Sequence, residues 1–284
     1  PTVAIGTDAF QEAPVTAIMG AVAKHVFLVT DATQLEETVR SAFDLARTGR
    51  PGPVVIDIPK DIQNWEGAFK GHGMLPLHGY RRRLRAITEN KLSDDACERF
   101  YTMLSESERP LIYAGGGVVN ANASKAMRQF AKEYGVPVAT TLMALGASDT
   151  NHPLALHMLG MHGVASANYA VEDCDFLIAI GARFDDRVAG NPAQFAPRAK
   201  NIAQFDVDSA EIGKVKRVDW HHVGILNTDL TDILEYGRSI KFDKTFKAWH
   251  EEVAMLKSEY AMNYDRSSDL IQPYAVIEEI NKHS

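Results

Sequence analysis

The sequence has little of several features that mark whole classes of protein. Only Cys97 and Cys174 are cysteines among 284 residues, which excludes a disulfide framework and suits a reducing cytoplasm or organelle matrix. No apolar run approaches the ~20 residues that cross a bilayer, and no N-terminal signal-peptide pattern is present. Lys and Arg total 30 against 37 Asp and Glu, spread along the chain, which disfavours nucleic acid as a partner. We therefore expect an unsecreted protein without a membrane partner.

Several catalytic motifs are missing as well. The ten histidines form no His-Glu-x-x-His motif, and no Cys/His pair occurs at metal-ligand spacing. There is no Gly-x-Ser-x-Gly elbow and no Gly-x-x-x-x-Gly-Lys-[Ser/Thr] loop. A zinc site, serine hydrolase chemistry and P-loop chemistry are therefore disfavoured.

What is present indicates a folded chain with two domains. Apolar residues make up 45% and charged residues 24%, close to the average of globular proteins, and the length favours two domains. The chain begins at Pro1 without Met and stops within a helical pattern at residues 274–284, so we expect both ends to be cut.

Residues 1–63 show the end of a strand–helix–strand domain. A helical pattern begins at Asp31, a candidate N-cap, with Leu35, Val39, Ala42, Phe43 and Ala46 on one face and Gly49 after its end. The run 54–58 then predicts a buried parallel strand. Residues 64–92 lack sustained periodicity and are rich in glycine and arginine, so we interpret them as a linker.

Residues 93–236 alternate between strand and helix patterns. We expect helices to about 104 and at 124–134, 165–171 and 229–236, and strands at 111–114, 136–140, 176–180, 202–207 and 223–226. This alternation predicts an α/β fold with an open, mostly parallel, doubly wound sheet, Rossmann-like in kind. A linker helix in 237–273 and a final segment at 274–284 follow.

Four strand ends carry residues suited to a nucleotide. They are Gly115–Gly117, Thr140–Met143, the charged run 181–188 and the acidic run 205–211. Ligands of such sheets bind outside the carboxyl ends of the strands. Each run also has a structural interpretation: a tight turn, a loop that closes the core, a solvated ion-pair loop, and helix capping by Asp208 or Ser209. The residues themselves thus indicate a nucleotide-type site and no more.

Specific motifs add a resemblance. Ile5–Glu12, Gly49–Asp61, His157–Gly163, Ala167–Ala170, Gly181–Val188 and Asp206–Gly213 occur in order along nearly the whole chain. Together they resemble the large subunit of acetohydroxyacid synthase, also called acetolactate synthase, a thiamine-diphosphate-dependent enzyme. The resemblance implies that 1–63 is part of the pyrimidine-binding domain, 93–236 the central FAD domain, and 274–284 the start of the diphosphate-binding domain.

The resemblance also implies an activity and partners. Such an enzyme condenses two pyruvates, or pyruvate and 2-oxobutyrate, with loss of CO₂ in branched-chain amino-acid biosynthesis. It uses thiamine diphosphate and Mg²⁺, binds FAD without net redox chemistry, and forms homodimers or tetramers that can take a regulatory small subunit. The alternatives are a stand-alone flavin- or nucleotide-binding module and a related thiamine-dependent lyase or transferase.

Site residues follow by position in the matching motifs. Near substrate and active site the resemblance places Gln11, Lys24, Asp186 and Arg187, the last as a forked partner of the substrate carboxylate. Its FAD contacts are Arg83, Gly115, Gly116, Gly117, Thr141, Leu142, Met143, Leu159, Gly160, Met161, His162, Gly181, Ala182, Arg183, Asp185, Val188, Asp206, Val207, Glu211, Asp229 and Leu230.

Three departures from the family pattern are visible. Thr228-Asp229 stands where the family often has Gly-Asp. The glutamate that activates the thiamine ring and the Gly-Asp-Gly…Asn motif that holds Mg²⁺ have no counterpart in these residues. We therefore assign no catalytic residue and no metal ligand, and we expect the chain alone to be inactive.

Overall fold

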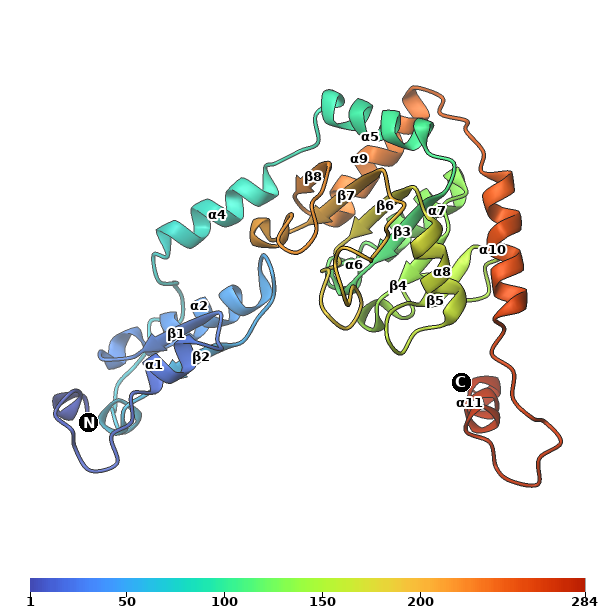
Figure 1. Cartoon of the computed structure of the whole chain (residues 1–284). Helices are drawn as coiled ribbons and strands as arrows, with labels where there is room; N and C mark the ends of the chain where they lie inside the picture. The colour runs from blue at the N-terminus through green and yellow to red at the C-terminus, as the bar shows by residue number, and fades with distance from the viewer. Residues whose placement is uncertain (284) are drawn as a thin grey trace. The chain divides into compact units, whose positions relative to one another are not determined.

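The structure is a computed structural model that describes residues 1–283 (Figure 1). Contacts divide the chain into two units, Pro1–Asn90 and Lys91–Ser284, which we describe separately. The elements of the first unit are η1 (Thr2–Ala4), α1 (Val15–Gly20), β1 (His25–Leu28), η2 (Ala32–Gln34), α2 (Leu35–Arg47), β2 (Val54–Asp57), α3 (Lys60–Gln63) and α4 (His78–Thr88).

The first unit is built on two parallel strands, β1 and β2, with α2 packed against them. Asp31 accepts a hydrogen bond from the Thr33 N–H, so it caps η2, the short turn before α2. The predicted buried face of this helix is wrong at Phe43, whose side chain is 66% exposed, whereas Leu45 is buried. Strand β2 is half-buried rather than fully buried.

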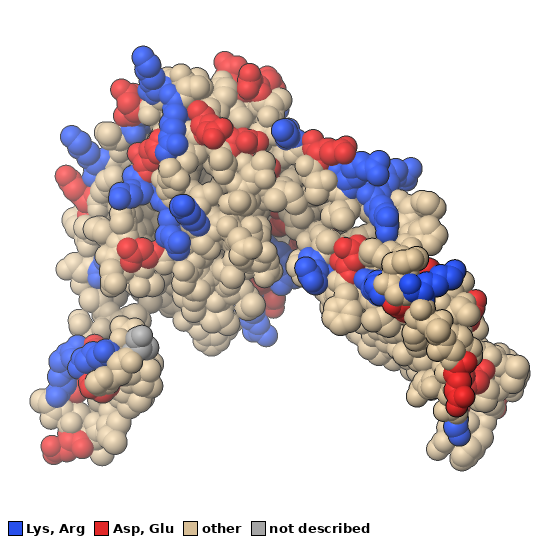
Figure 2. Space-filling model, turned by 180° about the vertical axis from the view of Figure 1, so that it is seen from behind, with Lys and Arg blue, Asp and Glu red and all other residues tan. Residues whose placement is uncertain are grey.

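A helix, α4, forms inside the range expected to be a linker, where no periodicity was seen. Its eleven residues include the basic run 81–85, and none of them is buried. Figure 2 shows basic side chains gathered over this helix. Tyr80, Leu84 and Ile87 recur at helical spacing in α4 and are half-buried. The sequence therefore carries a short amphipathic signal for this helix, which the linker interpretation overlooked.

The second unit contains the larger core. Its elements are α5 (Asp94–Glu106), β3 (Pro110–Ala114), α6 (Gly116–Asn120), α7 (Ser124–Tyr134), β4 (Val138–Thr140), η3 (Leu142–Ala144), β5 (Ala155–Met158), α8 (Ala165–Asp173), β6 (Phe176–Ile180), β7 (Asn201–Asp206), η4 (Ser209–Glu211), β8 (Trp220–Val223), α9 (Leu226–Ser239), α10 (Lys247–Glu259) and α11 (Pro273–His283).

All neighbouring strands of this sheet are parallel, in the order β5-β4-β3-β6-β7-β8. Every residue of β3 and β6 is buried, because helices cover both faces of the sheet. Helices α5, α7 and α9 contact one another, as do α8 and α10 (Figure 1). The expected α/β fold with a doubly wound parallel sheet is confirmed.

Local predictions hold where sequence signals are strong. Helix α7 and strand β6 have the predicted bounds, and Gly135 ends α7 with a φ of 65°. Three predictions need correction. Residues 116–120 form helix α6 rather than a turn, and strand β5 was not expected. The last strand, β8, lies at 220–223 rather than at 223–226, since helix α9 already begins at residue 226.

Both cysteines are inert by position. Cys97 lies in α5 and Cys174 directly before β6, and both thiols are buried. Burial raises the pKa of Cys97 to about 11 and also raises the pKa of Cys174. A buried thiol with a raised pKa forms little thiolate, so the surroundings of both cysteines disfavour reactivity.

Candidate functional site

The carboxyl ends of the six parallel strands share one edge of the sheet. From the central strand β3 the chain continues outward to β4 and β5, and from the neighbouring strand β6 it continues outward in the opposite direction to β7 and β8. The strand order therefore reverses between β3 and β6. In open α/β sheets, ligands bind at such a switch point, outside the carboxyl ends of the strands. The segments that follow β3, β4, β5, β6 and β7 hold most of the predicted FAD contacts.

Glycines let the segments after β3 and β6 approach each other closely. The Gly115 N–H donates to the Ile180 carbonyl at 2.9 Å, and the Gly117 N–H donates to the Gly181 carbonyl at 3.0 Å. A Cβ on Gly115 would lie 2.2 Å from the Gly181 oxygen, and one on Gly117 would lie 2.7 Å from the Gly181 Cα. Packing between the two segments therefore requires these glycines, independently of any ligand.

The segment after β4 presents both polar and apolar groups. The hydroxyl oxygens of Thr140 and Thr141 are buried and have no hydrogen-bond partner among residues 1–283. Leu142 and Met143 follow in η3 with exposed side chains. Buried hydroxyls normally have partners, so this pair is consistent with a bound polar group.

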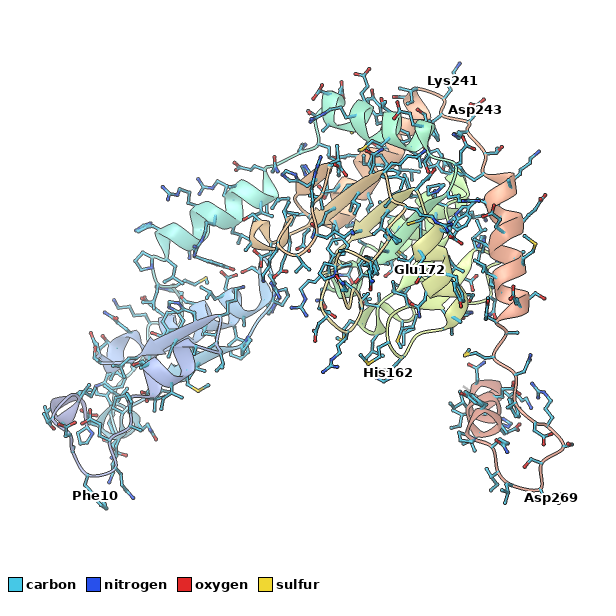
Figure 3. The ribbon with its side chains drawn as sticks, viewed as in Figure 1. Phe10, His162, Glu172, Lys241, Asp243 and Asp269 are labelled. Carbon is cyan, nitrogen blue, oxygen red and sulfur yellow. The ribbon has the colours of Figure 1, made fainter. Side chains whose placement is uncertain are left out.

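The segment after β5 is fixed to neighbouring loops. Gly160 has a φ of 98°; its N–H donates to Asn168 Oδ1 at 2.8 Å, and Asn168 Nδ2 donates back to the Gly160 carbonyl at 3.1 Å. The Met161 N–H donates to the Arg187 carbonyl at 3.1 Å, while the Met161 side chain is exposed. Leu159 is buried, and Figure 3 shows His162 at the margin of the second unit. Asn168 is an organising residue to which sequence reasoning gave no role.

The loop after β6 carries four charges. The Arg183 guanidinium lies 3.7 Å from an Asp185 carboxylate oxygen, and Arg187 lies 3.9 Å from Asp186. Both arginine side chains are more than half exposed, and the Arg187 N–H donates to Asp185 Oδ1 at 3.1 Å. Ala182 is buried beneath the loop. The exposed guanidiniums can meet an anion at this edge.

The carboxylate at the end of β7 is buried. Asp206 is 8% exposed, accepts the Asp208 N–H at 2.9 Å, and has its pKa raised mainly by burial. Asp208 itself accepts the Ala210 N–H, so the capping interpretation holds for Asp208. Val207 is half-buried, and Glu211 is buried with Lys214 Nζ 3.1 Å from its carboxylate.

A second buried carboxylate lies at the start of α9. Asp229 is 1% exposed and its Oδ1 lies 3.3 Å from His222 Nε2. Within the part of the chain that the structure describes, its Oδ2 has no hydrogen-bond partner. Burial raises the pKa of Asp229, and the hydrogen bond with His222 opposes that rise. Leu230 belongs to the hydrophobic core. His222 was not predicted, because nothing in the sequence links it to Asp229.

Three predicted residues belong to the first unit and are described by themselves. Gln11 is exposed and has a φ of 62°. Lys24 Nζ donates to the carbonyls of Leu45 and Thr48, at 2.5 and 2.6 Å, so it caps the end of α2. Arg83 is exposed on α4.

The structure also bears on metals and membranes. Among residues 1–283, no group of three or more His, Cys, Asp or Glu side chains is placed to hold a metal ion. Across the same residues, no helix has both the length and the apolar character to span a membrane.

Comparisons with known proteins show what this chain is similar to. Residues 97–233 match the model of the thiamine pyrophosphate enzyme central domain. The chain is 42% identical to acetolactate synthase 2, chloroplastic, of Nicotiana tabacum and to the acetolactate synthase large subunit of Corynebacterium glutamicum, over 98% of its own length. It spans 41% and 44% of the lengths of these two relatives. Residues 97–233 therefore carry the central domain of thiamine pyrophosphate enzymes, and the chain is similar over nearly its whole length to a segment of the acetolactate synthase large subunits.

Proposed function

We propose that the carboxyl edge of the second unit's sheet binds FAD. The observation that carries this proposal is the pair of buried hydroxyls of Thr140 and Thr141. They lack hydrogen-bond partners among the described residues and lie at the edge where ligands of such sheets bind. The similarity to acetolactate synthases supports it, because FAD is the nucleotide cofactor that the resemblance implies.

The residues present fit a dinucleotide in charge and polarity. Arg183 offers an exposed cation for a diphosphate, and Asp206 offers a carboxylate for ribose or ribityl hydroxyls. The exposed side chains of Leu142, Met143 and Met161 offer apolar contacts for rings. When bound, FAD supplies a planar scaffold beside the active site without net redox chemistry.

We further propose that the whole protein is a thiamine-dependent carboligase. It would condense two pyruvates, or pyruvate and 2-oxobutyrate, with loss of CO₂ for branched-chain amino-acid biosynthesis, in the cytoplasm or an organelle. Gln11 and Lys24 would lie near substrate, and Arg187, beside Asp186, would hold the carboxylate of the second 2-oxoacid with its forked guanidinium. Thiamine diphosphate and Mg²⁺ would belong to the complete enzyme; within residues 1–283 no group of three or more His, Cys, Asp or Glu side chains is placed to hold the ion, so we assign it no ligand here.

Assembly is part of the same proposal. We propose a homodimer or tetramer of the large subunit, with a regulatory small subunit as a further partner. Exposed apolar side chains at the site edge, including Leu145 beside the three above, support a covering partner there.

Titration of the purified chain with FAD tests the first proposal. We expect quenching of flavin fluorescence with a dissociation constant in the range of tens of micromolar or below. Arg183→Ala should weaken binding about tenfold or more, because a charged hydrogen bond to phosphate is lost. The matched control is Arg198→Ala, since Arg198 is similarly exposed and also pairs with an aspartate, Asp173. The FAD affinity of the Arg198→Ala chain should equal that of the unchanged chain.

Two results would contradict the proposal. Unchanged flavin fluorescence up to 100 micromolar chain, with a normal melting transition, would show that this edge does not take FAD. Equal weakening by both arginine substitutions would show that net charge rather than the site governs binding.

A further inference from the structure

A tyrosine in the middle of the sheet contacts the charged loop after β6. Tyr113 lies in β3, is fully buried, and its hydroxyl donates to the Arg183 carbonyl at 2.6 Å. Its ring packs against Phe184 and Phe195, with ring centroids 5.7 and 5.9 Å away. The two phenylalanines also pack against each other at 5.9 Å.

This contact fixes a specific part of the loop. Gly181, at the start of the loop, donates its N–H to the Phe205 carbonyl, and the Arg187 carbonyl accepts the Met161 N–H. Between these two anchors, the Tyr113 hydroxyl holds the peptide plane that joins Arg183 to Phe184. The direction in which a side chain leaves the backbone depends on the peptide planes beside it, so this bond constrains Arg183.

The Tyr113 hydroxyl stays protonated and can therefore always donate this hydrogen bond. Burial raises the pKa of Tyr113, so the hydroxyl keeps its proton across the physiological range. The ring is fully buried and packs against both Phe184 and Phe195, which leaves the hydroxyl little freedom to choose another acceptor. The strand that carries it, β3, is one of the two central strands of the sheet, and β6 is the other.

We propose that Tyr113 is a positioning residue, whose hydroxyl orients the Arg183 segment toward the diphosphate of the bound dinucleotide. This inference rests on the proposed FAD function. Tyr113 touches no ligand itself; it acts through the Arg183 carbonyl.

The test compares Tyr113→Phe with Tyr101→Phe. Tyr101 is the matched control because its buried hydroxyl also donates to a backbone carbonyl, that of Ile233, at 2.9 Å. Each substitution removes one tyrosine hydrogen bond to a backbone carbonyl, so both should lower the melting temperature by a similar amount, about 2–4 °C. Only Tyr113→Phe should raise the dissociation constant of FAD, by about fivefold or more, and change the bound flavin's circular dichroism.

A second variant separates the hydrogen bond from the packing. Phe195→Leu trims the ring cluster and leaves the Tyr113 hydroxyl in place, so the dissociation constant of FAD should stay within about twofold. A loss of affinity equal to that of Tyr113→Phe would overturn the inference, because packing alone would then explain the effect.

A third measurement needs no flavin. Trypsin should cleave after Arg183 and Arg187 about fivefold faster in Tyr113→Phe than in Tyr101→Phe, with cleavage after Arg198 as the internal reference. If the unchanged chain binds no FAD, the proposed function fails, and so does the positioning role. Cleavage then still decides whether the hydroxyl holds the loop. Three results would overturn the positioning role. They are tryptic cleavage that does not change in Tyr113→Phe, faster cleavage with unchanged FAD affinity, and a Tyr113→Phe chain that does not fold.

Discussion

His222 Nε2 lies 3.3 Å from Asp229 Oδ1, and both side chains are buried where β8 ends and α9 begins. The contact joins β8, an edge strand of the sheet, to the helix that follows it. A Cβ on Gly224 would lie 2.6 Å from the imidazole and 2.7 Å from the carboxylate, so the pair is closely enclosed. A charged carboxylate in such surroundings depends strongly on its partner.

We predict that His222→Leu destabilises the chain by about 3–5 kcal/mol at neutral pH, because the substitution leaves the Asp229 carboxylate buried without its partner. Burial already raises the pKa of Asp229, and losing the opposing hydrogen bond raises it further. The loss should therefore shrink at acidic pH, where the carboxyl becomes neutral. Denaturant unfolding at pH 7 and at pH 4 measures this difference.

The control for this prediction is the preceding residue. His221 is exposed in the same strand, so His221→Leu should change the unfolding free energy by no more than about 0.5 kcal/mol. Equal effects at the two histidines, or a His222→Leu loss that does not depend on pH, would show that the pair has no special electrostatic role.

How much of the fold the sequence predicts depends on whether each element is defined by local residues or by contacts between distant ones. Helix α7 and strand β6 were predicted to the residue because local patterns and Gly135 define them. Strand β5 was missed because its signal is weak: it is short, its register against β4 shifts, and His157 within it has a φ of 62°. A non-glycine residue in that region cannot be foreseen from alternation.

The candidate site divides in the same way. The glycines and charges after the strands were predicted, because strand ends are visible in the sequence. The residues that hold these segments in place were not predicted. Tyr113 is 70 residues from Arg183, and Asn168, which bonds to Gly160, lies in helix α8. Such pairs depend on tertiary packing, so no local pattern indicates them. The close packing of Gly117 on Gly181 likewise emerged only from the fold.

We predict that Asp206→Asn stabilises the chain and weakens its binding of FAD. Burial raises the pKa of Asp206 above its ordinary 3.8. The stability linked to this carboxyl is therefore full below pH 3.8 and is lost as pH rises through the raised value. The asparagine variant lacks this loss, so at pH 7 it should be more stable by about 0.5–2 kcal/mol, with no such gain below pH 3.8.

Unfolding curves at several pH values and FAD titration check both parts of the Asp206 prediction. The control is Asp243→Asn, an exposed aspartate labelled in Figure 3, which should change neither quantity. A pH-independent gain would assign the effect to something other than the buried charge. Unchanged FAD affinity would remove Asp206 from the proposed site.

We predict that Gly117→Ala destabilises the second unit by about 1–3 kcal/mol, the usual effect of overpacking. Alanine favours a helix over glycine by about 0.5–1 kcal/mol, but here its Cβ would meet backbone atoms of Gly181 that cannot move aside. Gly79→Ala is the control, because Gly79 lies in α4 with open space around it. It should be neutral or slightly stabilising by thermal melting. Equal stability of the two variants would contradict the close approach.

The last prediction concerns Arg187 in a protein of the relatives' full length that carries this segment. An arginine pairs with a carboxylate through two parallel hydrogen bonds, whereas lysine offers a point charge on a flexible stem. Arg187→Lys should therefore preserve folding and the first decarboxylation, while it lowers carboligation and the preference between pyruvate and 2-oxobutyrate. Competition kinetics with both acceptors, beside a melting curve, measures these effects.

The alternative for Arg187 is visible in the structure. Its side chain is 74% exposed and lies 3.9 Å from Asp186, a distance too long for a hydrogen bond. An exposed pair of this kind contributes little to stability, so a purely structural role predicts unchanged kinetics in the variant. Arg198→Lys is the control, because Arg198 also pairs on the surface with an aspartate, Asp173. If Arg187→Lys matches this control in rate and product ratio, Arg187 does not hold the substrate carboxylate, since only a forked contact distinguishes arginine from lysine at that position.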